Sequence, residues 1–236
     1  SLKRCVSAGE FLPKSVSDTW FEKTGIRIID GIGATKLIHI FISAAGEEIR
    51  PGSTGKPLPG YKACVLDEDG EQMLPGATGR LAVTGPTGCR YLDDERQRDY
   101  VQNGWNVTGD LYRLDEDGYF WFVSRADDMI VSAGYNISGP EVENALLDHA
   151  GVQECGVVGV PDSERGQVVK AFVVLRPGVE ATADTAKELQ DFVKREIAPY
   201  KYPRAVEYLT ALPRTETGKL QRFRLRQPAA GGADLR

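Results

Sequence analysis

The pattern of apolar residues changes near residue 126, and this change limits the possible folds more than any other feature. Between Tyr61 and Ser124, four β-rich runs occur: YKACVLD, RLAVTG, TGDLYRL and YFWFVS. Asp115-Glu116-Asp117-Gly118 separates the last two runs and is typical of a hairpin turn. The polar run DDERQRDYV has helical character. We therefore expect an antiparallel, barrel-like β layer in this part of the chain.

After residue 126, strands and helices alternate. Ser138 and Glu141 have the spacing of a capping box and predict a helix that reaches about His149. VQECGVVGV and QVVKAFVVL are strand-like, and a second helix is predicted from about Thr185 to Ala198. The order strand, helix, two strands, helix and strand predicts a small α+β domain, so the fold class is α+β.

Composition excludes several classes of function. The 236 residues are 41% hydrophobic and 27% charged, which is typical of a globular protein. The net charge of −5, with both signs interleaved, gives no basic stripe for a nucleic acid. No apolar stretch approaches the about 20 residues that cross a bilayer, so no membrane association is expected.

Cysteine usage favours a reducing compartment. The four cysteines are far apart, no C-x-x-C occurs, and the chain has only two histidines, so neither a disulfide framework nor a zinc site is indicated. A cytoplasmic location is expected. The chain begins with Ser1 and no initiator Met, which suggests processing or a fragment. The cysteines are Cys5, Cys64, Cys89 and Cys155.

The segment PRTETGK near the C-terminus presents one lysine, Lys219, after a Thr-Gly pair. A phosphate-binding P-loop is excluded here, because Pro213 stands where its first Gly is needed and Leu220 follows the lysine. Taken alone, this segment is more typical of a solvated surface lysine in a turn.

Five motifs, in this order, carry a resemblance to a known family: DGIGATK, GRLAVTG, WNVTGD, SRADDMIVSAGYNISGPEVE and PRTETGK. They resemble the later motifs of the adenylate-forming superfamily, which includes acyl-CoA synthetases, amino-acid adenylation domains and firefly-type luciferases. The match runs from about Ser7 to Arg222. DGIGATKLIHIFIS and RADDMIVSAGYNISGPEVE look most like benzoate-CoA and 2-aminobenzoate-CoA ligases. The Ser/Thr/Gly-rich phosphate loop of the family is not in this sequence, so the chain looks like a C-terminal half.

The resemblance implies a domain organisation. Residues 1–126 would be the C-terminal part of the large domain, incomplete because the phosphate loop is missing. Residues 127–227 would be the small, mobile C-terminal lid domain. Residues 228–236, PAAGGADLR, have too little apolar content to fold and would be a disordered tail.

The resemblance also implies a reaction. ATP converts a carboxylate into an acyl-adenylate with loss of pyrophosphate, and a thiol then displaces AMP. Negative charge builds on the α-phosphate in the first step, where preorganised cations are usually the largest catalytic contribution. Lys219 would be that cation, and Thr35 would contribute a hydroxyl as the second catalytic residue.

Nucleotide binding is assigned to three segments by the same resemblance. Asp110 would accept hydrogen bonds from both ribose hydroxyls, and Arg125 would donate from the same side. The alternatives are a plain turn before a strand for T-G-D and a surface ion pair for Arg125. The two sides of the adenine site would be formed by Gly9, Glu10 and Phe11, and by Asp30, Gly31 and Ile32.

Further roles follow for the hinge, the thioester step and the acyl pocket. Asp127 would be the hinge, since the two half-reactions need different faces of the small domain. The segment from Gly134 through Tyr135 to Asn136 would lie beside the pantetheine path, the alternative being a plain hairpin turn. Gly33, His39 and Ile40 would line the aromatic ring, although His39 could equally be a core histidine. His149 is expected only to complement a helix dipole.

Three positions depart from the family pattern. Lys36 replaces the glutamate that would be linked to Mg²⁺, which should weaken metal-assisted departure of pyrophosphate. Val107 replaces a basic residue and Ser124 replaces a glycine, which are milder changes. With the phosphate loop also missing, Lys36 argues against adenylation by this chain alone.

The sequence therefore predicts part of an aryl carboxylic acid–CoA ligase that uses ATP, Mg²⁺ and CoA. Its partners would be these small molecules and an aromatic carboxylic acid, with no nucleic acid and no membrane; a homodimer is allowed for. Two alternatives stay open: a catalytically impaired nucleotide- or CoA-binding module, and an adenylation domain that loads a carrier protein.

Overall fold

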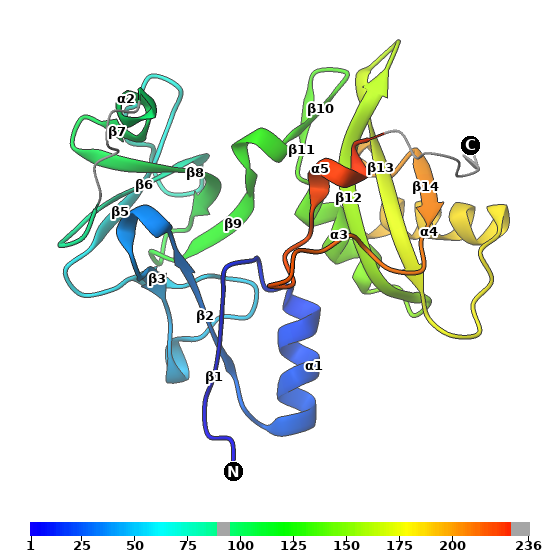
Figure 1. Cartoon of the computed structure of the whole chain (residues 1–236), viewed down its shortest axis with the longest axis horizontal. Coiled ribbons are helices and arrows are strands. Elements are labelled where there is room, and N and C mark those ends of the chain that lie inside the picture. The colour runs from blue at the N-terminus through cyan, green and yellow to red at the C-terminus, as the bar shows by residue number, and fades with distance from the viewer. Residues whose placement is uncertain (89–94, 228–236) are drawn as a thin grey trace. The chain divides into compact units, whose positions relative to one another are not determined.

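The computed structural model describes residues 1–88 and 95–227. The chain divides into two compact units, Ser1–Asp127 and Asp128–Arg236, and each is described by itself (Figure 1). The tail predicted to be disordered, residues 228–236, and the first residues of the predicted polar helix lie outside the described residues. No helix in the described ranges has the length and apolar content needed to cross a membrane.

The first unit begins with a four-stranded sheet that the sequence analysis did not predict. Its strands are, in spatial order, β1 (Cys5–Ala8), β2 (Ile28–Gly33), β3 (Ile40–Ser43) and β4 (Lys56–Pro57). β1 and β2 are parallel, and α1 (Lys14–Thr24) is the crossover between them; the other pairs are antiparallel. Gly25 ends α1 with a left-handed backbone, φ 68°.

A second sheet, of five antiparallel strands, follows. It contains β5 (Lys62–Leu66), β6 (Thr78–Thr84), β7 (Val101–Gln102), β8 (Trp105–Leu114) and β9 (Phe120–Arg125). The spatial order is β5-β6-β8-β7, and β9 pairs with β8. The polar run forms a short helix, α2 (Arg96–Tyr100). The predicted antiparallel strands and the DEDG hairpin are thereby confirmed.

The two sheets of the first unit meet at Gly55 and Phe120. These residues form a β-bridge in which the Phe120 amide donates to the Gly55 carbonyl at 2.8 Å and the Thr54 amide donates to the Phe120 carbonyl at 3.0 Å. The result is one curled layer that encloses a continuous apolar core; the prediction of a barrel-like layer covered only the part between Tyr61 and Ser124. That core consists of Leu37, Phe41, Ile42, Val65, Leu81, Val83, Tyr112 and Phe120.

The second unit is a five-stranded sheet with two helices of several turns. The order β11 (Tyr135–Ile137), β10 (Ile130–Ser132), β13 (Gly166–Leu175), β12 (Val152–Asp162) defines the main path, and β14 (Ala205–Tyr208) pairs parallel with β13. Apolar residues of the sheet pack against α3 (Gly139–Leu147) and α4 (Ala183–Glu196). The predicted element order missed two features: a hairpin of two strands, not one strand, precedes α3, and a short helix, α5 (Arg222–Leu225), follows β14.

The helix ends follow the expected capping chemistry with small shifts in position. The Ser138 hydroxyl accepts from the Glu141 amide at 3.2 Å, which confirms the predicted N-cap of α3. Thr182 caps α4, so this helix starts two residues before its predicted start. α3 ends at Leu147, and His149 therefore lies beyond it. There its ring packs on Phe192 and its Nε2 lies 3.3 Å from the Glu188 carboxylate of α4.

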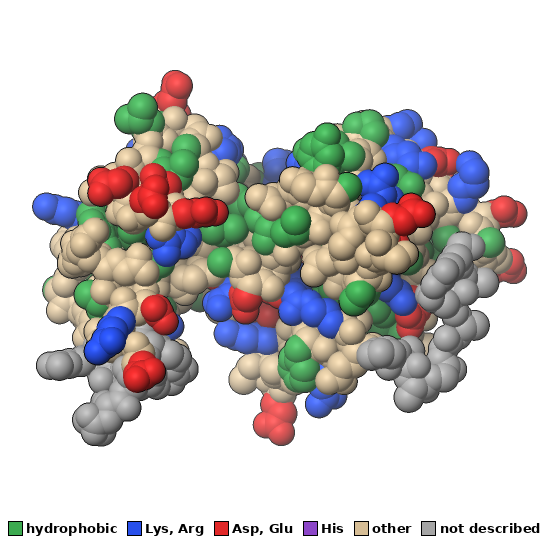
Figure 2. Space-filling model, turned by 90° about the horizontal axis from the view of Figure 1, so that it is seen from above, with side chains coloured by type: hydrophobic (Ala, Val, Ile, Leu, Met, Phe, Trp, Pro, Cys, Tyr) green, Lys and Arg blue, Asp and Glu red, His purple; other side chains and the backbone are tan. Residues whose placement is uncertain are grey.

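Charged side chains of both signs are interspersed over the face seen in Figure 2. This agrees with the small net charge of −5 for 29 basic and 34 acidic residues. The face shown there therefore carries mixed charge, as the sequence indicates.

Candidate functional site

Asp110 lies in an irregular stretch of β8 and not in a turn before a strand. Three residues of β8, Thr108, Gly109 and Asp110, face the single residue Leu81 of β6. Gly109 has φ 86°, a left-handed backbone that few other residues adopt. The Thr108 hydroxyl accepts from the Asp110 amide at 3.2 Å and donates to the Leu81 carbonyl at 3.3 Å. This bulge fixes the direction in which Asp110 points, and the plain-turn interpretation is wrong.

Arg125 connects two carboxylates of the first unit. It pairs with Asp110 across β8 and β9, and its Nη1 lies 3.4 Å from Asp110 Oδ1. Its Nε donates to Asp127 Oδ1 at 3.2 Å. The side chain of Asp110 is only 14% exposed, whereas that of Arg125 is 50% exposed. An ion pair this exposed stabilises little by itself, but it holds a donor and an acceptor side by side.

Burial raises the pKa of the Asp110 carboxyl above its ordinary value. The positive charge of Arg125, the Thr108 hydroxyl and the positive charge of Lys36 oppose this rise, and the charge of Asp127 adds to it. Asp110 is thus a desolvated acceptor whose ionised form depends on neighbouring cations. Such a carboxylate gains from accepting two hydroxyl hydrogen bonds at once.

An aromatic cluster joins the segment around Phe11 to β8 and β9. The Phe11 ring stacks on Phe122 with centroids 5.4 Å apart, and Tyr112 meets Phe122 edge-on at 5.5 Å. The Tyr112 hydroxyl lies 3.3 Å from the Thr54 hydroxyl. Burial, together with the negative charges of Asp110 and Asp30, raises the pKa of Tyr112 far above its ordinary value. Phe11 is thus joined to Tyr112 through Phe122, and the charges of Asp30 and Asp110 act on the same buried tyrosine.

Asp30 lines a small pocket of the first unit. Ser17 of α1 and the loop residues Ser53 and Thr54 also line it. Asp30 Oδ1 is buried and accepts no hydrogen bond from the described residues. Burial raises the pKa of Asp30 from its ordinary 3.8 to about 6, and the Gly31 amide opposes this rise. A group that donates a hydrogen bond would satisfy this oxygen.

The connection from β2 to β3 carries the predicted acyl-pocket residues. A Cβ on Gly33 would lie 2.9 Å from the His39 carbonyl oxygen, so only glycine allows this approach. Ile38 has φ 71° at the centre of a γ-turn in which the His39 amide donates to the Leu37 carbonyl at 2.8 Å. His39 is exposed, so its interpretation as a core histidine is wrong. Ile40 is half-buried and pairs with Gly33.

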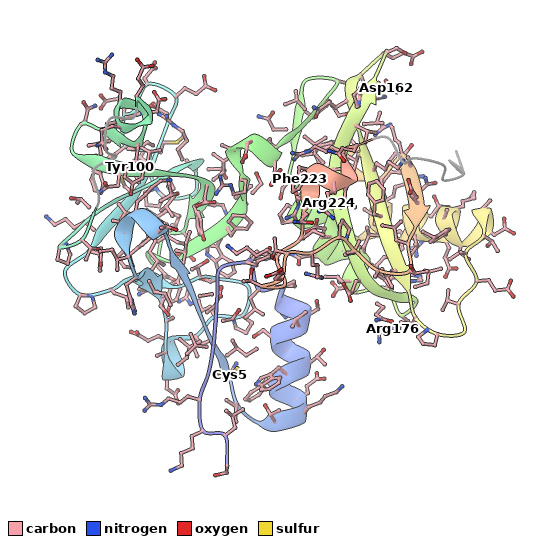
Figure 3. All side chains as sticks on the ribbon, viewed as in Figure 1. Cys5, Tyr100, Asp162, Arg176, Phe223 and Arg224 are labelled. Atoms are coloured by element: carbon pink, nitrogen blue, oxygen red, sulfur yellow. The ribbon has the colours of Figure 1, made fainter. Side chains whose placement is uncertain are left out.

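Lys36 occupies a 3₁₀ turn, Thr35–Leu37, between the same two strands. Its Nζ lies 4.8 Å from the ring centroid of Tyr100, the residue labelled at the end of α2 in Figure 3. No group of three or more His, Cys, Asp or Glu suited to a metal ion occurs among the described residues. A cation in place of a carboxylate does not fit a Mg²⁺ ligand, and Mg²⁺ therefore stays a prediction.

Lys219, in the second unit, is carried by a tight hairpin. Arg214 and Leu220 form its β-bridge, and the Thr215 amide donates to the Lys219 carbonyl at 2.8 Å. The Lys219 amide donates to the Thr215 hydroxyl at 3.0 Å, and Gly218 turns the chain with φ 88°. The lysine itself is exposed. An ordered turn thus presents the ammonium group to solvent.

The residues predicted for the hinge and the thioester step are exposed: Asp127 and Gly134 lie in turns, and Tyr135 and Asn136 lie in β11. Gly134, with φ 82°, connects β10 to β11, so this segment does form the turn of a hairpin. Tyr135 is 54% exposed and its ring lies 4.6 Å from that of Tyr200. Asp127 is the last residue of the first unit and lies in a 3₁₀ turn, Ala126–Asp128. Its hinge role and the thioester role of residues 134–136 stay predictions.

Sequence reasoning missed several residues that shape these positions. Thr108 could have been found, because it belongs to the T-G-D string itself. Tyr112 and Phe122 carry no signal beyond an ordinary strand pattern, since their role comes from the packing of Phe11. Among the adenine residues, Gly9 and Glu10 are exposed and Ile32 is half-buried.

Comparison with known proteins gives two consistent family matches. The model of the AMP-binding enzyme family matches residues 1–90, and the model of the AMP-binding enzyme C-terminal domain matches residues 141–219. The mouse protein "Acyl-coenzyme A synthetase ACSM3, mitochondrial" is 44% identical over 236 residues, which cover 96% of this chain and 41% of that protein.

Solved structures agree. The anthranilate CoA ligase AuaEII in complex with anthranoyl-AMP is 43% identical, with a TM-score of 0.89, over 95% of this chain and 44% of that one. A benzoate CoA ligase from Burkholderia xenovorans LB400 is 37% identical, with a TM-score of 0.87, over 96% of this chain and 46% of that one. The chain thus spans less than half the length of these relatives. Both family models and these relatives show that the chain belongs to the family of AMP-binding, adenylate-forming enzymes.

Proposed function

We propose that the chain is the C-terminal portion of an ATP-dependent aryl carboxylic acid–CoA ligase. The reaction would join the acid to AMP and then transfer the acyl group to CoA. Two relatives act on aromatic acids by their descriptions, an anthranilate CoA ligase and a benzoate CoA ligase. The observation that carries the proposal is the pairing of Asp110 with Arg125 across β8 and β9, the two strands to which Phe11 is joined through Phe122 and Tyr112.

These residues suit the nucleotide. Asp110 would accept from the ribose hydroxyls, and Arg125, held beside it at 3.4 Å, would donate to the same sugar. Phe11 would offer an aromatic face to the base. Asp30 has a buried oxygen without a hydrogen-bond partner among the described residues, which would accept from an exocyclic amine.

The acid would lie near the β2–β3 connection, where Gly33 pairs with Ile40 across the sheet and His39 directly precedes Ile40. Thr35, exposed at the start of the 3₁₀ turn, would donate its hydroxyl to the acyl-phosphate centre. Lys219 would supply the positive charge as the α-phosphate becomes more negative. Asp127 would then allow the second unit to turn, and the Gly134–Asn136 segment would serve the attack by the thiol.

The test needs the residues that precede the matched region. We would join the corresponding N-terminal part of the Burkholderia xenovorans benzoate CoA ligase to Ser1 and measure acid-dependent exchange of pyrophosphate into ATP. Benzoate and 2-aminobenzoate should support exchange, and Asp110→Asn should lower it by about tenfold or more, because a charge-assisted hydrogen bond pair is lost. Asp117→Asn, in an exposed turn, is the matched control.

The same N-terminal part joined to its own C-terminal part serves as the positive control. If that protein is active and the fusion with this chain exchanges pyrophosphate with no aromatic acid, the proposed function is wrong. Transfer of the acyl group to free CoA, compared with transfer to a phosphopantetheinyl carrier protein, identifies the acceptor.

One observation favours a second candidate, a nucleotide-binding protein with impaired adenylation. Lys36 places an ammonium group where the family has a carboxylate, and this group contacts the Tyr100 ring. In the fusion protein, a rise in Mg²⁺-dependent exchange in Lys36→Glu would instead favour a ligase that only this lysine weakens. Calorimetry with a non-hydrolysable acyl-adenylate mimic separates the candidates, since binding without turnover even in Lys36→Glu supports the binding protein.

A further inference from the structure

The hairpin that carries Lys219 is held by one arginine on each side. Before the lysine, Arg214 donates to the Gly218 carbonyl at 2.8 Å and to Glu154 Oε2 at 2.9 Å. After the lysine, Nη2 of Arg222 lies 2.7 Å from both oxygens of Glu143 on α3. The hairpin is therefore tied to β12 on one side and to α3 on the other.

The two ion pairs differ in burial. The side chains of Arg214 and Glu154 are 41% and 40% exposed, so this pair is screened by water. Those of Arg222 and Glu143 are 22% and 13% exposed. Glu143 Oε1 also accepts from the Val157 amide of β12 at 2.8 Å. Loss of one partner from such a buried pair leaves the other charge uncompensated.

The pKa of Glu143 shows that its ionised form depends on Arg222. Burial raises the pKa of the Glu143 carboxyl, and the positive charge of Arg222 is the largest opposing contribution. The Val157 amide also lowers this pKa, whereas the charge of Asp128 raises it. Asp128 is itself bound by Arg226, one residue after α5.

Apolar packing seats the same side of the hairpin on β12. Leu225 of α5 is buried with Val158 and Phe172, and Leu220 packs against this cluster. A Cβ on Gly156 would lie 2.9 Å from Leu225 Cδ1 and 3.1 Å from Leu220 Cδ2, so a glycine lets the two leucines approach the strand. Arg222 lies between these two leucines in the sequence, so its ion pair fixes a segment that is already packed.

We propose that Glu143 and Arg222 are a positioning pair, which holds the Lys219 hairpin in place for the half-reaction that uses the lysine. The inference rests on the proposed function. Neither residue needs to touch the substrate, because both act through the hairpin. Arg222 comes three residues after Lys219 in the sequence. Its partner Glu143 lies on α3, the helix that follows the β10–β11 hairpin.

The first test measures the two half-reactions separately in the fusion protein. Arg222→Gln should lower acid-dependent pyrophosphate exchange by about ten- to a hundredfold, because a shift of about 1 Å can cost this much. Transfer from a preformed aryl-adenylate to CoA should stay within about twofold, since that step does not use Lys219. Arg222→Lys keeps the charge and should recover part of the exchange.

Arg224→Gln is the matched control. Figure 3 labels Phe223 and Arg224 on α5, where both are exposed and the Arg224 guanidinium lies 5.9 Å from the Phe223 ring centroid. This variant should leave both half-reactions unchanged. An equal loss of both half-reactions in Arg222→Gln, or no loss in either, overturns the positioning pair.

A second test does not depend on activity. In this chain, Arg222→Gln should speed hydrogen exchange of the Gly218 and Lys219 amides by about tenfold or more, while the amides of β13 exchange as before. Unchanged exchange at the hairpin overturns the proposal. If the unsubstituted fusion protein is inactive but the hairpin amides respond, the proposed function has failed and the positioning pair stands.

Discussion

At the scale of single residues, the first unit keeps a carboxylate in a place that favours its neutral form. Asp30 has one oxygen without a hydrogen-bond partner among the described residues, and burial raises its pKa from 3.8 to about 6. The folded protein therefore binds a proton more readily than the unfolded chain, and stability falls as the pH rises from about 4 to about 6.

Asp30→Asn should remove this loss of stability, because asparagine carries no charge at any pH. We expect the free energy of unfolding of the first unit to rise by up to about 3 kcal/mol at pH 7.5, with no gain below about pH 4. Urea titrations followed by tryptophan fluorescence at both pH values measure it. Asp69→Asn, in an exposed turn, should change stability by less than about 0.5 kcal/mol. A gain that is the same at both pH values would refute the explanation.

Gly55 is the residue that lets the two sheets of the first unit meet. Its φ is 116°, and a Cβ there would lie 2.2 Å from the Ser43 carbonyl carbon. Gly55→Ala should therefore lower the free energy of unfolding by about 3 kcal/mol or more, since backbone must shift. Gly118→Ala is the matched control, because φ is 82° but nothing lies within 4 Å.

For Gly118→Ala we expect only the backbone cost of about 1 to 2 kcal/mol. Both variants are compared by urea unfolding with tryptophan fluorescence. Equal losses in the two variants would mean that the close approach of Gly55 to Ser43 contributes nothing.

At the scale of elements, the sequence predicts the strands of the second sheet but not their register. The DEDG turn correctly predicts that TGDLYRL and YFWFVS pair. Leu114 pairs with Phe120, so a regular hairpin would place Asp110 opposite Ser124. The irregularity after Leu111 places Arg125 there instead. The ion pair between Asp110 and Arg125 therefore depends on a register shift that the residue pattern does not predict.

Other elements escaped prediction for physical reasons. α1 has a single buried residue, Ser17, so it lacks the apolar face that marks a helix. α5 has four residues, too few for periodicity, and it is held by the pairing of Arg222 with Glu143, 79 residues away in the chain. His39 was open to two interpretations because LIHIF is apolar, but the γ-turn at Ile38 leaves it exposed.

α4 shows the opposite case, a helix whose pattern predicts its contacts. Ala186, Leu189 and Val193 repeat at helical spacing and are its buried residues. Leu189 is fully buried, so Leu189→Ala should lower the free energy of unfolding of the second unit by about 2 to 5 kcal/mol. Native-state hydrogen exchange of the β13 amides measures this loss.

Glu196→Ala, at the exposed end of α4, is the control and should change stability by less than about 0.5 kcal/mol. If both variants leave the slowest β13 amides unchanged, α4 does not belong to the cooperative core of the second unit.

At the scale of the whole molecule, the chain consists of two units with separate apolar cores. The larger core of the first unit contains Leu37, Phe41 and Phe120, and that of the second contains Val142, Val169 and Leu189. Each core draws its residues from one unit. The rotation of the second unit that the proposed function calls for needs such a division, because a shared core would not permit it.

Separate cores predict separate unfolding. All three tryptophans, Trp20, Trp105 and Trp121, lie in the first unit, so tryptophan fluorescence reports its unfolding alone. In Leu189→Ala, the hydrogen exchange of β13 should accelerate while the midpoint of the fluorescence transition in urea stays unchanged. In Gly55→Ala, the midpoint of the fluorescence transition should fall while the hydrogen exchange of β13 stays unchanged. If either substitution shifts both signals by equal free energies, the units unfold as one cooperative body, and a mobile lid built from the second unit becomes untenable.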